Sequence, residues 1–184
     1  FFTGAGLNTV ERDTSGELII SPTFNSERTI TLLEDICNFM WSGSDAFYGE
    51  TGTVFALENT MFTLDRSRMA LRHKDEITFE YGIVPVPKFD EIQENYVTCL
   101  AFPYTMYTIS ISSKIPDIAA ATLECLCSEG YRKTTPMLFE ITMKYKYATD
   151  NDSARMYDII RGTVSIDIGR IFTTELNNIS YSLF

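Results

Sequence analysis

Tyr81-Gly-Ile-Val-Pro-Val-Pro-Lys88 is the stretch that decides the fold that this sequence predicts. The apolar and aromatic residues from Phe79 to Val84 predict a β-strand, and this strand runs directly into two prolines. Neither proline can donate a backbone hydrogen bond, and each fixes its own φ angle. We therefore expect the strand to leave its sheet at Pro85 and to continue as a stiff extended segment.

The chain on both sides of this stretch predicts strands that alternate with helices. Residues 96–111 are mostly β-branched and aromatic, which favours two strands or one long bent strand. Capping residues, prolines and helical spacing predict helices over residues 26–41, 66–72, 118–128, 136–147, 152–162 and 170–184. Glycines are expected to end the first and third of these helices, at Gly43 and Gly130. This order indicates an α/β or mixed layered architecture.

Composition limits the classes of function that the chain can have. It has 184 residues, of which 45% are hydrophobic, so it can bury one sizeable core or parts of two. The net charge is −10 and the densest basic stretch, 66–74, is interrupted by apolar residues, so we do not expect nucleic acid as a partner. No apolar run reaches the roughly 18 residues that span a bilayer. The sequence shows no metal-ligating His/Cys cluster and no phosphate loop.

The four cysteines are not spaced for a metal or redox motif. They are Cys37, Cys99, Cys125 and Cys127. The last two lie two residues apart on a predicted helix and face different sides. Small buried thiols are the simplest interpretation, and disulfides remain open.

Five segments occur in an order and spacing that is typical of one protein family. They are Phe55–Phe62, Thr63–Met69, Tyr81–Pro87, Met106–Ser112 and Lys114–Leu123. In this order the chain resembles the C-terminal half of bacterial extracellular solute-binding proteins of the sugar-binding type, which serve ABC importers. Glu58 departs from the family pattern, which usually has glycine there, although the neighbouring Asn59 tolerates a left-handed turn.

The resemblance implies a type II periplasmic-binding-protein-like α/β fold, in which two lobes are joined by hinge strands. Residues 1–103 and 130–184 would then belong to the C-terminal lobe. Residues 104–129 would supply a hinge strand and a helix of the other lobe. Both ends of the sequence resemble cuts within an element, so we expect a fragment of a protein about twice as long. Its missing half would carry a lipid anchor and place the protein outside the cell.

The function that the resemblance implies is binding and not catalysis. A carbohydrate would be captured in the cleft between the lobes and delivered to the permease subunits in the membrane, with no cofactor and no metal. The lobes would close because the ligand contacts both of them. Two alternatives remain: a carboxylate-based glycoside hydrolase, and an interaction domain without a small ligand.

The turn Asp65-Arg66-Ser67 is the strongest candidate for the ligand site. In the family, residues just after the preceding strand reach the cleft, and carboxylate and guanidinium groups suit paired sugar hydroxyls. The alternative is that Asp65 caps the helix over 66–72 and that Arg66 is solvated.

Aromatic side chains are the second kind of candidate, because flat rings pack on the C–H faces of sugars. We select Tyr104 and Tyr107 near the hinge, Trp41 at a helix end, and Phe172. Tyr104 and Tyr107 do not share strand parity, so at most one of them points at the cleft unless a bulge intervenes. For Trp41 and Phe172 the alternative is packing within the core.

The hydrolase alternative needs two carboxyl groups that face each other across a cleft. The closest acidic groups in the sequence are Asp90-Glu91 with Glu94, and Glu34-Asp35. Both lie on polar segments that are typical of a solvated surface. His73, the only histidine, lies in a polar stretch and would have to serve any Ser-His-Asp triad.

Overall fold

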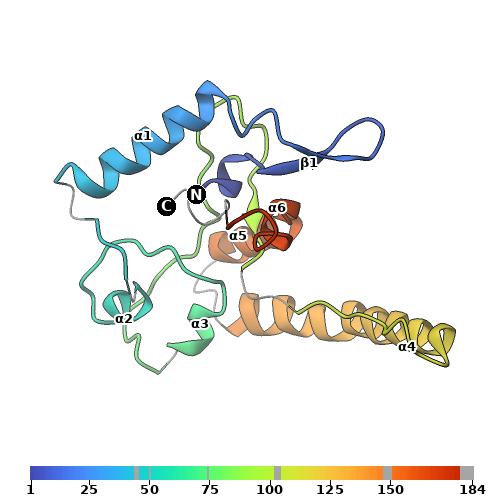
Figure 1. Cartoon of the computed structure of the whole chain (residues 1–184). Helices are drawn as coiled ribbons and strands as arrows, with labels where there is room; N and C mark the ends of the chain where they lie inside the picture. The colour runs from blue at the N-terminus through green and yellow to red at the C-terminus, as the bar shows by residue number, and fades with distance from the viewer. Residues whose placement is uncertain (44–45, 50, 74, 102–104, 147–150, 179–184) are drawn as a thin grey trace. The chain divides into compact units, whose positions relative to one another are not determined.

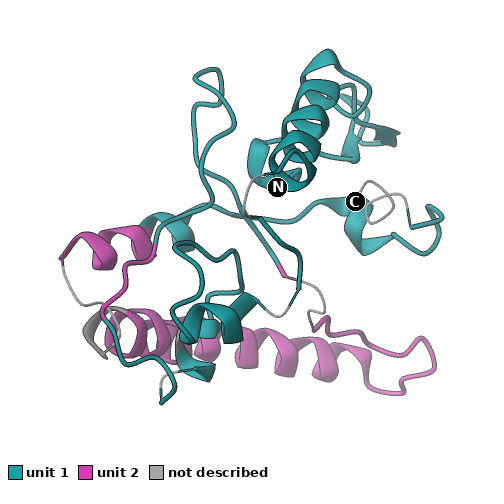
Figure 2. Cartoon of the chain, turned by 90° about the vertical axis from the view of Figure 1, so that its left-hand side faces the viewer, with its two compact units in different colours: residues 1–79, 84–100, 159–184 teal, residues 80–83, 101–158 magenta. Residues whose placement is uncertain are grey.

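A computed structural model describes residues 1–43, 46–49, 51–73, 75–101, 105–146 and 151–178 of the chain. The chain forms two compact units, which Figure 2 shows in different colours. Unit 1 comprises Phe1–Phe79, Val84–Leu100 and Ile159–Phe184, and unit 2 comprises Glu80–Ile83 and Ala101–Asp158. The lobe boundaries expected after residues 103 and 129 stay a prediction, as does the periplasmic-binding fold.

The core of unit 1 forms around the 3-10 turn η1 (Thr3–Ala5). Phe2, Ala5, Leu7 and Leu32 are buried together, and Phe24, Ile36 and Phe89 pack against them. The rings of Phe2 and Phe24 meet edge to face with their centroids 6.0 Å apart. Such pairs add to the stabilisation that comes from burying apolar area.

A hairpin of β1 (Val10–Arg12) and β2 (Leu18–Ile20) follows this turn, with the two strands antiparallel. Asp13 organises the loop between them, because its Oδ1 accepts the N–H groups of Ser15 at 2.8 Å and Glu17 at 3.0 Å. The Ser15 hydroxyl, followed by these backbone groups, holds the pKa of Asp13 below its ordinary value.

Helix α1 (Glu27–Trp41) confirms the first predicted helix and both of its ends (Figure 1). The side chain of Ser26 accepts a hydrogen bond from the N–H of Thr29, as an N-cap does. Gly43 follows the helix with a φ of 89°, the left-handed conformation that ends helices.

The alternative interpretation of Trp41, packing within the core, is wrong, because 74% of this residue is exposed. The sequence shows an apolar stripe on α1 that begins at Ile30, and Ile30 is exposed as well. The helix instead buries Thr29 and Leu32, and Ile36 packs against the same core. A second stripe, formed by Thr29, Leu32 and Ile36 at spacings of three and four residues, therefore faces the core of unit 1.

Residues 79–84 form no strand, contrary to the prediction. The described residues contain only two two-stranded sheets, so this segment has no strand beside it to share ladder hydrogen bonds. Packing holds the following residues instead. Pro85 is buried, and Val86 lies so close to Gly4 that a Cβ on the glycine would be 2.8 Å from Val86 Cγ1.

Gln93 anchors the loop that follows the two prolines. Its side chain is buried, and Oε1 accepts the N–H of Phe89 at 3.0 Å. Its Nε2 donates to the carbonyl oxygens of Gly4 and Asn95, each at 2.9 Å. The buried amide is thus satisfied, and it ties the loop to the core of unit 1.

Helix α2 (Thr51–Ala56) ends in a Schellman motif. The N–H of Glu58 donates to the Phe55 carbonyl at 2.9 Å, and that of Asn59 donates to the Val54 carbonyl at 3.1 Å. Glu58 has a φ of 59°, so the left-handed residue is Glu58 itself and not Asn59. This is the position at which the family pattern has glycine.

The second sheet is a parallel pair of β3 (Thr98–Cys99) and β4 (Val164–Ser165). Among the described residues of the segment 96–111, where strands were predicted, only these two residues of β3 form a strand, and residues 105–110 form none. The expected hinge strand is therefore not formed in the described part of that segment.

Asp167 joins the last helix to the hairpin of unit 1. This buried residue caps α6 (Ile168–Ile171) by accepting the N–H of Gly169 at 2.9 Å, and it also accepts the Thr9 hydroxyl at 3.0 Å. The helix is much shorter than the predicted 170–184, because the chain turns after Ile171 and reaches left-handed φ values at Asn177 and Asn178.

Unit 2 contains a long helical rod, drawn from yellow to orange in Figure 1. It comprises α4 (Pro116–Glu129), the π-type turns η2 (Gly130–Thr134) and the π-type segment η3 (Met137–Lys146). The predicted end at Gly130 is wrong, because this glycine keeps helical angles of −58° and −46°. Wider turns lie on both sides of Pro136, whose missing N–H interrupts the α-helical pattern.

Helix α5 (Asn151–Gly162) confirms the predicted helix over 152–162. It carries Tyr157, which is fully buried, and its hydroxyl has no hydrogen-bond partner within the described residues. Burial, and next the nearby Tyr81, raises the pKa of Tyr157 above its ordinary value.

The interpretation of the cysteines as buried thiols is wrong for three of the four. Cys37, Cys125 and Cys127 are exposed, and Cys99 is half-buried. All four are free thiols. Helix α4 buries none of its residues, which explains the exposure of its two cysteines.

Candidate functional site

An open pocket of about 440 Å³ lies in unit 1, and we call it the Tyr48–His73 pocket. Three consecutive parts of the chain line it: the loop before α2, the first residues of α2, and the segment that leads into α3 (Met69–Arg72). The lining residues are Tyr48, Gly49, Thr51, Gly52, Leu64, Asp65, Arg66, Arg68, Met69, Arg72 and His73. Its size is within the usual range for small-molecule sites.

Gly52 and His73 form the inner part of this pocket. Both residues are buried, and the Nδ1 of His73 lies 2.6 Å from Glu76 Oε2. A Cβ on Gly52 would be 2.9 Å from His73 Nε2 and 3.3 Å from Asp65 Oδ2. The absence of a side chain at position 52 is therefore what lets α2 approach both groups.

Asp65 lies at the pocket and does not cap the helix that follows. Its Oδ1 accepts the N–H of Arg66 at 2.6 Å, while the N-cap of α3 is Arg68, which makes no side-chain cap. The predicted helix over 66–72 is correspondingly shortened to its last four residues. The capping interpretation of Asp65 is wrong, and Asp65 Oδ2 faces Gly52 instead.

Three arginines give the pocket a positive lining. Arg66, Arg68 and Arg72 line it together with one described carboxylate, that of Asp65. The N–H of Arg72 donates to the Arg68 carbonyl at 3.0 Å, so these two residues are one helical turn apart. Side chains at this spacing lie on the same face.

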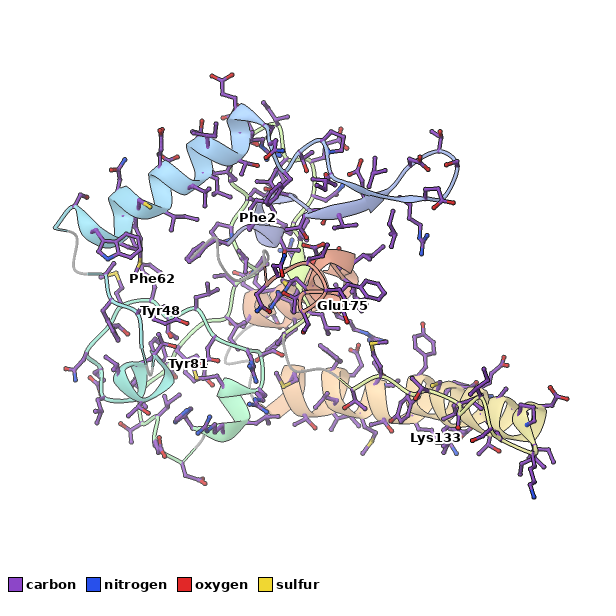
Figure 3. All side chains as sticks on the ribbon, in the orientation of Figure 1. Phe2, Tyr48, Phe62, Tyr81, Lys133 and Glu175 are labelled. Atoms are coloured by element: carbon purple, nitrogen blue, oxygen red, sulfur yellow. The ribbon has the colours of Figure 1, made fainter. Side chains whose placement is uncertain are left out.

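Tyr48 supplies the aromatic ring of the pocket. It lies on the loop between α1 and α2 and is 97% exposed (Figure 3). An exposed ring beside charged planar groups can pack on an apolar ligand face while those groups take polar substituents. The strand that the family resemblance implies at Met61–Leu64 is not formed, and Phe62 is 82% exposed.

Of the predicted ligand-binding residues that the structure describes, Asp65 and Arg66 lie in this lining. Ser67 is exposed and outside it. Trp41 and Phe172 are exposed elsewhere in unit 1, so core packing is also wrong for Phe172, and Tyr107 is 69% exposed in unit 2. Tyr104 lies outside the described residues.

The sequence reasoning missed Tyr48, Arg68, Arg72 and His73 as pocket residues. A signal for Tyr48 was present, because it lies in a loop rich in glycine and serine whose ring has no helical or strand pattern to bury it. In the sequence the arginines form a basic stretch that apolar residues interrupt. Only the geometry of α3 shows that Arg68 and Arg72 share a face.

The acidic groups considered for hydrolysis do not face each other across a pocket. Glu34, Asp35, Glu91 and Glu94 are exposed on the surface. Asp90 forms a bidentate ion pair with Arg28, whose Nε and Nη2 donate to its carboxylate at 2.8 and 3.0 Å. This hydrogen bonding holds the pKa of Asp90 below the ordinary value. A general acid needs the opposite shift.

The described residues contain no cluster of three metal-ligating side chains. Among them, no helix has the length and apolarity that crossing a bilayer requires. The chain matches no protein-family model, no curated protein and no solved structure. Any assignment of function therefore depends on the order of the sequence motifs and on the chemistry of the Tyr48–His73 pocket.

Proposed function

We propose that this chain is the ligand-binding part of an extracellular solute-binding protein. In the full-length, lipid-anchored protein it would capture a carbohydrate and deliver it unchanged to the membrane subunits of an ABC importer. One observation carries the proposal: Asp65 and Arg66, selected from the sequence pattern, line one pocket together with the exposed ring of Tyr48.

The chemistry of this pocket suits a sugar. The ring of Tyr48 offers a flat surface for the C–H face of a pyranose. The Asp65 carboxylate accepts hydrogen bonds from hydroxyl groups, and the Arg66 guanidinium donates them in a planar fork. A pocket of about 440 Å³ is large enough for a mono- or disaccharide.

The number of carboxylates at the pocket favours a binding function over glycoside hydrolysis. Asp65 is the one carboxylate among the described lining residues, whereas glycosidases use a pair. An interaction domain is the second candidate, because Ile30 and Trp41 leave an apolar stripe of α1 exposed.

Isothermal titration against mono- and oligosaccharides, with peptides and polyamines as further ligands, tests the proposal. We expect a sugar to bind and to be recovered intact by chromatography. Asp65→Ala should weaken binding about tenfold or more, since a lost hydrogen bond to a charged group costs about 1.5–3 kcal/mol. Tyr48→Ala should weaken it severalfold, because it removes the ring that packs on the sugar. Tyr131→Ala is the matched control, because Tyr131 is 71% exposed on η2 of the other unit.

Each alternative has its own outcome in this experiment. Binding of peptides or polyamines, without binding of any sugar, would contradict the carbohydrate as the ligand but would still support a solute-binding protein. Release of cleaved sugar would favour the hydrolase. Absence of binding by every ligand tested would overturn the proposal and leave the interaction domain as the remaining candidate.

A further inference from the structure

Arg68 and Arg72 place two like charges close together in unit 1. They lie one turn apart at α3, on the same face, and both line the Tyr48–His73 pocket. Like charges at this spacing destabilise a helix by a few tenths of a kcal/mol, so the arrangement opposes folding.

Neither arginine has a compensating acid among the described residues. Other arginines do: Arg28 pairs with Asp90 at 2.8 Å, and Arg132 pairs with Glu129 at 3.1 Å. The chain has 25 acidic and 15 basic residues, so pairing would be easy to achieve. Two neighbouring guanidinium groups that line a pocket, without an acidic partner among the described residues, are instead typical of a site that binds an anion.

We infer that the Tyr48–His73 pocket selects an anionic saccharide, that is, a sugar that carries a carboxylate or a phosphate. This inference rests on the proposed function. Its described side chains of fixed charge are three arginines and one aspartate, a net charge of +2 in a chain whose net charge is −10. The guanidinium fork matches the geometry of both oxyanions.

The positions of the charges also orient the ligand. Asp65 Oδ2 faces α2 at Gly52, whereas Arg68 and Arg72 lie at the two ends of α3, as its N-cap and its last residue. The carboxylate of Asp65 repels an anion and accepts hydroxyl hydrogens. The oxyanion therefore points toward α3, and the neutral hydroxyl groups point toward Asp65.

Isothermal titration of the whole chain with glucose, glucuronate and glucose 6-phosphate, and with oligomers of the first two, tests the inference. We expect at least one anionic sugar to bind tenfold or more tightly than its neutral counterpart, and this advantage to shrink as salt rises. Comparing glucuronate with glucose 6-phosphate distinguishes carboxylate from phosphate.

Two substitutions assign the effect to the arginines. Arg68→Gln and Arg72→Gln should each reduce the affinity for the anionic sugar about tenfold, and reduce the affinity for its neutral counterpart by a clearly smaller factor, because only the anionic sugar loses a charge-assisted hydrogen bond. Arg155→Gln is the matched control, because it removes one positive charge from an exposed site on α5. Circular dichroism checks that every variant is folded.

The inference and the proposed function fail differently. Neutral and anionic sugars that bind equally well, or anionic binding that survives both arginine substitutions, would overturn the inference and leave the proposed function intact. Absence of binding by all sugars would overturn both.

Discussion

Replacing Glu58 by glycine is expected to stabilise unit 1, although glycine within a helix usually has the opposite effect. Glu58 ends α2 with a φ of 59°, a conformation that costs an L-residue about 1–2 kcal/mol. Its side chain is exposed and makes no ion pair within the described residues, so its removal loses no contact.

The size of the effect follows from two opposing terms. Glycine removes the left-handed strain of about 1–2 kcal/mol, but its greater freedom in the unfolded chain costs about 0.4–1 kcal/mol. The free energy of unfolding should therefore rise by about 0.5–1 kcal/mol, which is a Tm increase of about 1–4 °C for a chain of this length.

Urea unfolding followed by far-UV circular dichroism measures this change, with equal m-values required for comparison. Glu58→Ala is the control, because it removes the same carboxylate and keeps the strain. Asn59→Gly should give no gain, because Asn59 is not left-handed. A Glu58→Gly protein that is no more stable than Glu58→Ala would refute the assignment of the left-handed residue.

Three further changes test other contacts. Tyr157→Phe should stabilise the protein by about 1 kcal/mol in urea unfolding, because it removes a buried hydroxyl without a partner in the described structure. Gly169→Ala should destabilise it by about 2 kcal/mol or more, because the new Cβ overlaps the Thr9 side chain and breaks its bond to the Asp167 cap. Arg28→Ala should raise the pKa of Asp90 in an NMR titration, because the guanidinium bond that lowers it is lost.

The first two of these changes each have a contrasting measurement. Tyr157→Leu should destabilise, because it leaves a cavity, and a loss of stability in Tyr157→Phe would mean that the hydroxyl is bonded. Thr9→Ala combined with Gly169→Ala should cost less than the sum of the two single substitutions, because the Thr9 hydroxyl that the new Cβ would overlap is gone, although the Cβ of residue 9 stays 2.9 Å away. Full additivity would contradict the overlap.

The Arg28 pair also predicts the direction of a pH effect. Because the folded pKa of Asp90 lies below its ordinary value, its stabilising contribution is present above about pH 4 and is lost as the pH falls through the folded pKa. Wild-type stability should therefore fall more steeply than that of Arg28→Ala in this acidic range. Parallel curves would contradict the coupling.

The sequence predicted the elements whose ends are fixed by local chemistry. Ser26 and Gly43 bound α1 because a capping hydroxyl and a left-handed glycine act within a few residues. The strand at 79–84 was wrong because a strand depends on a neighbour that local residues do not specify. The predicted helix end at Gly130 was wrong because glycine can also adopt helical angles.

The candidate site was predictable in part for the same reason. The polar turn at Asp65 and Arg66 is a local feature, and both residues line the pocket. The contributions of Tyr48 and Gly52 depend on how α2 lies against His73, which is a tertiary contact. The shared face of Arg68 and Arg72 depended on where α3 begins, a boundary that sequence patterns locate least well.

NMR mapping of the ligand site is the most direct test of the central claim, that the Tyr48–His73 pocket holds a sugar. The isotope-labelled chain would be titrated with the tightest-binding saccharide, and shifts of the backbone amides would be followed. We predict the largest changes at Tyr48, Gly52 and residues 65–73. Saturable changes confined to other residues, such as those around Trp41 or Tyr107, would contradict the account.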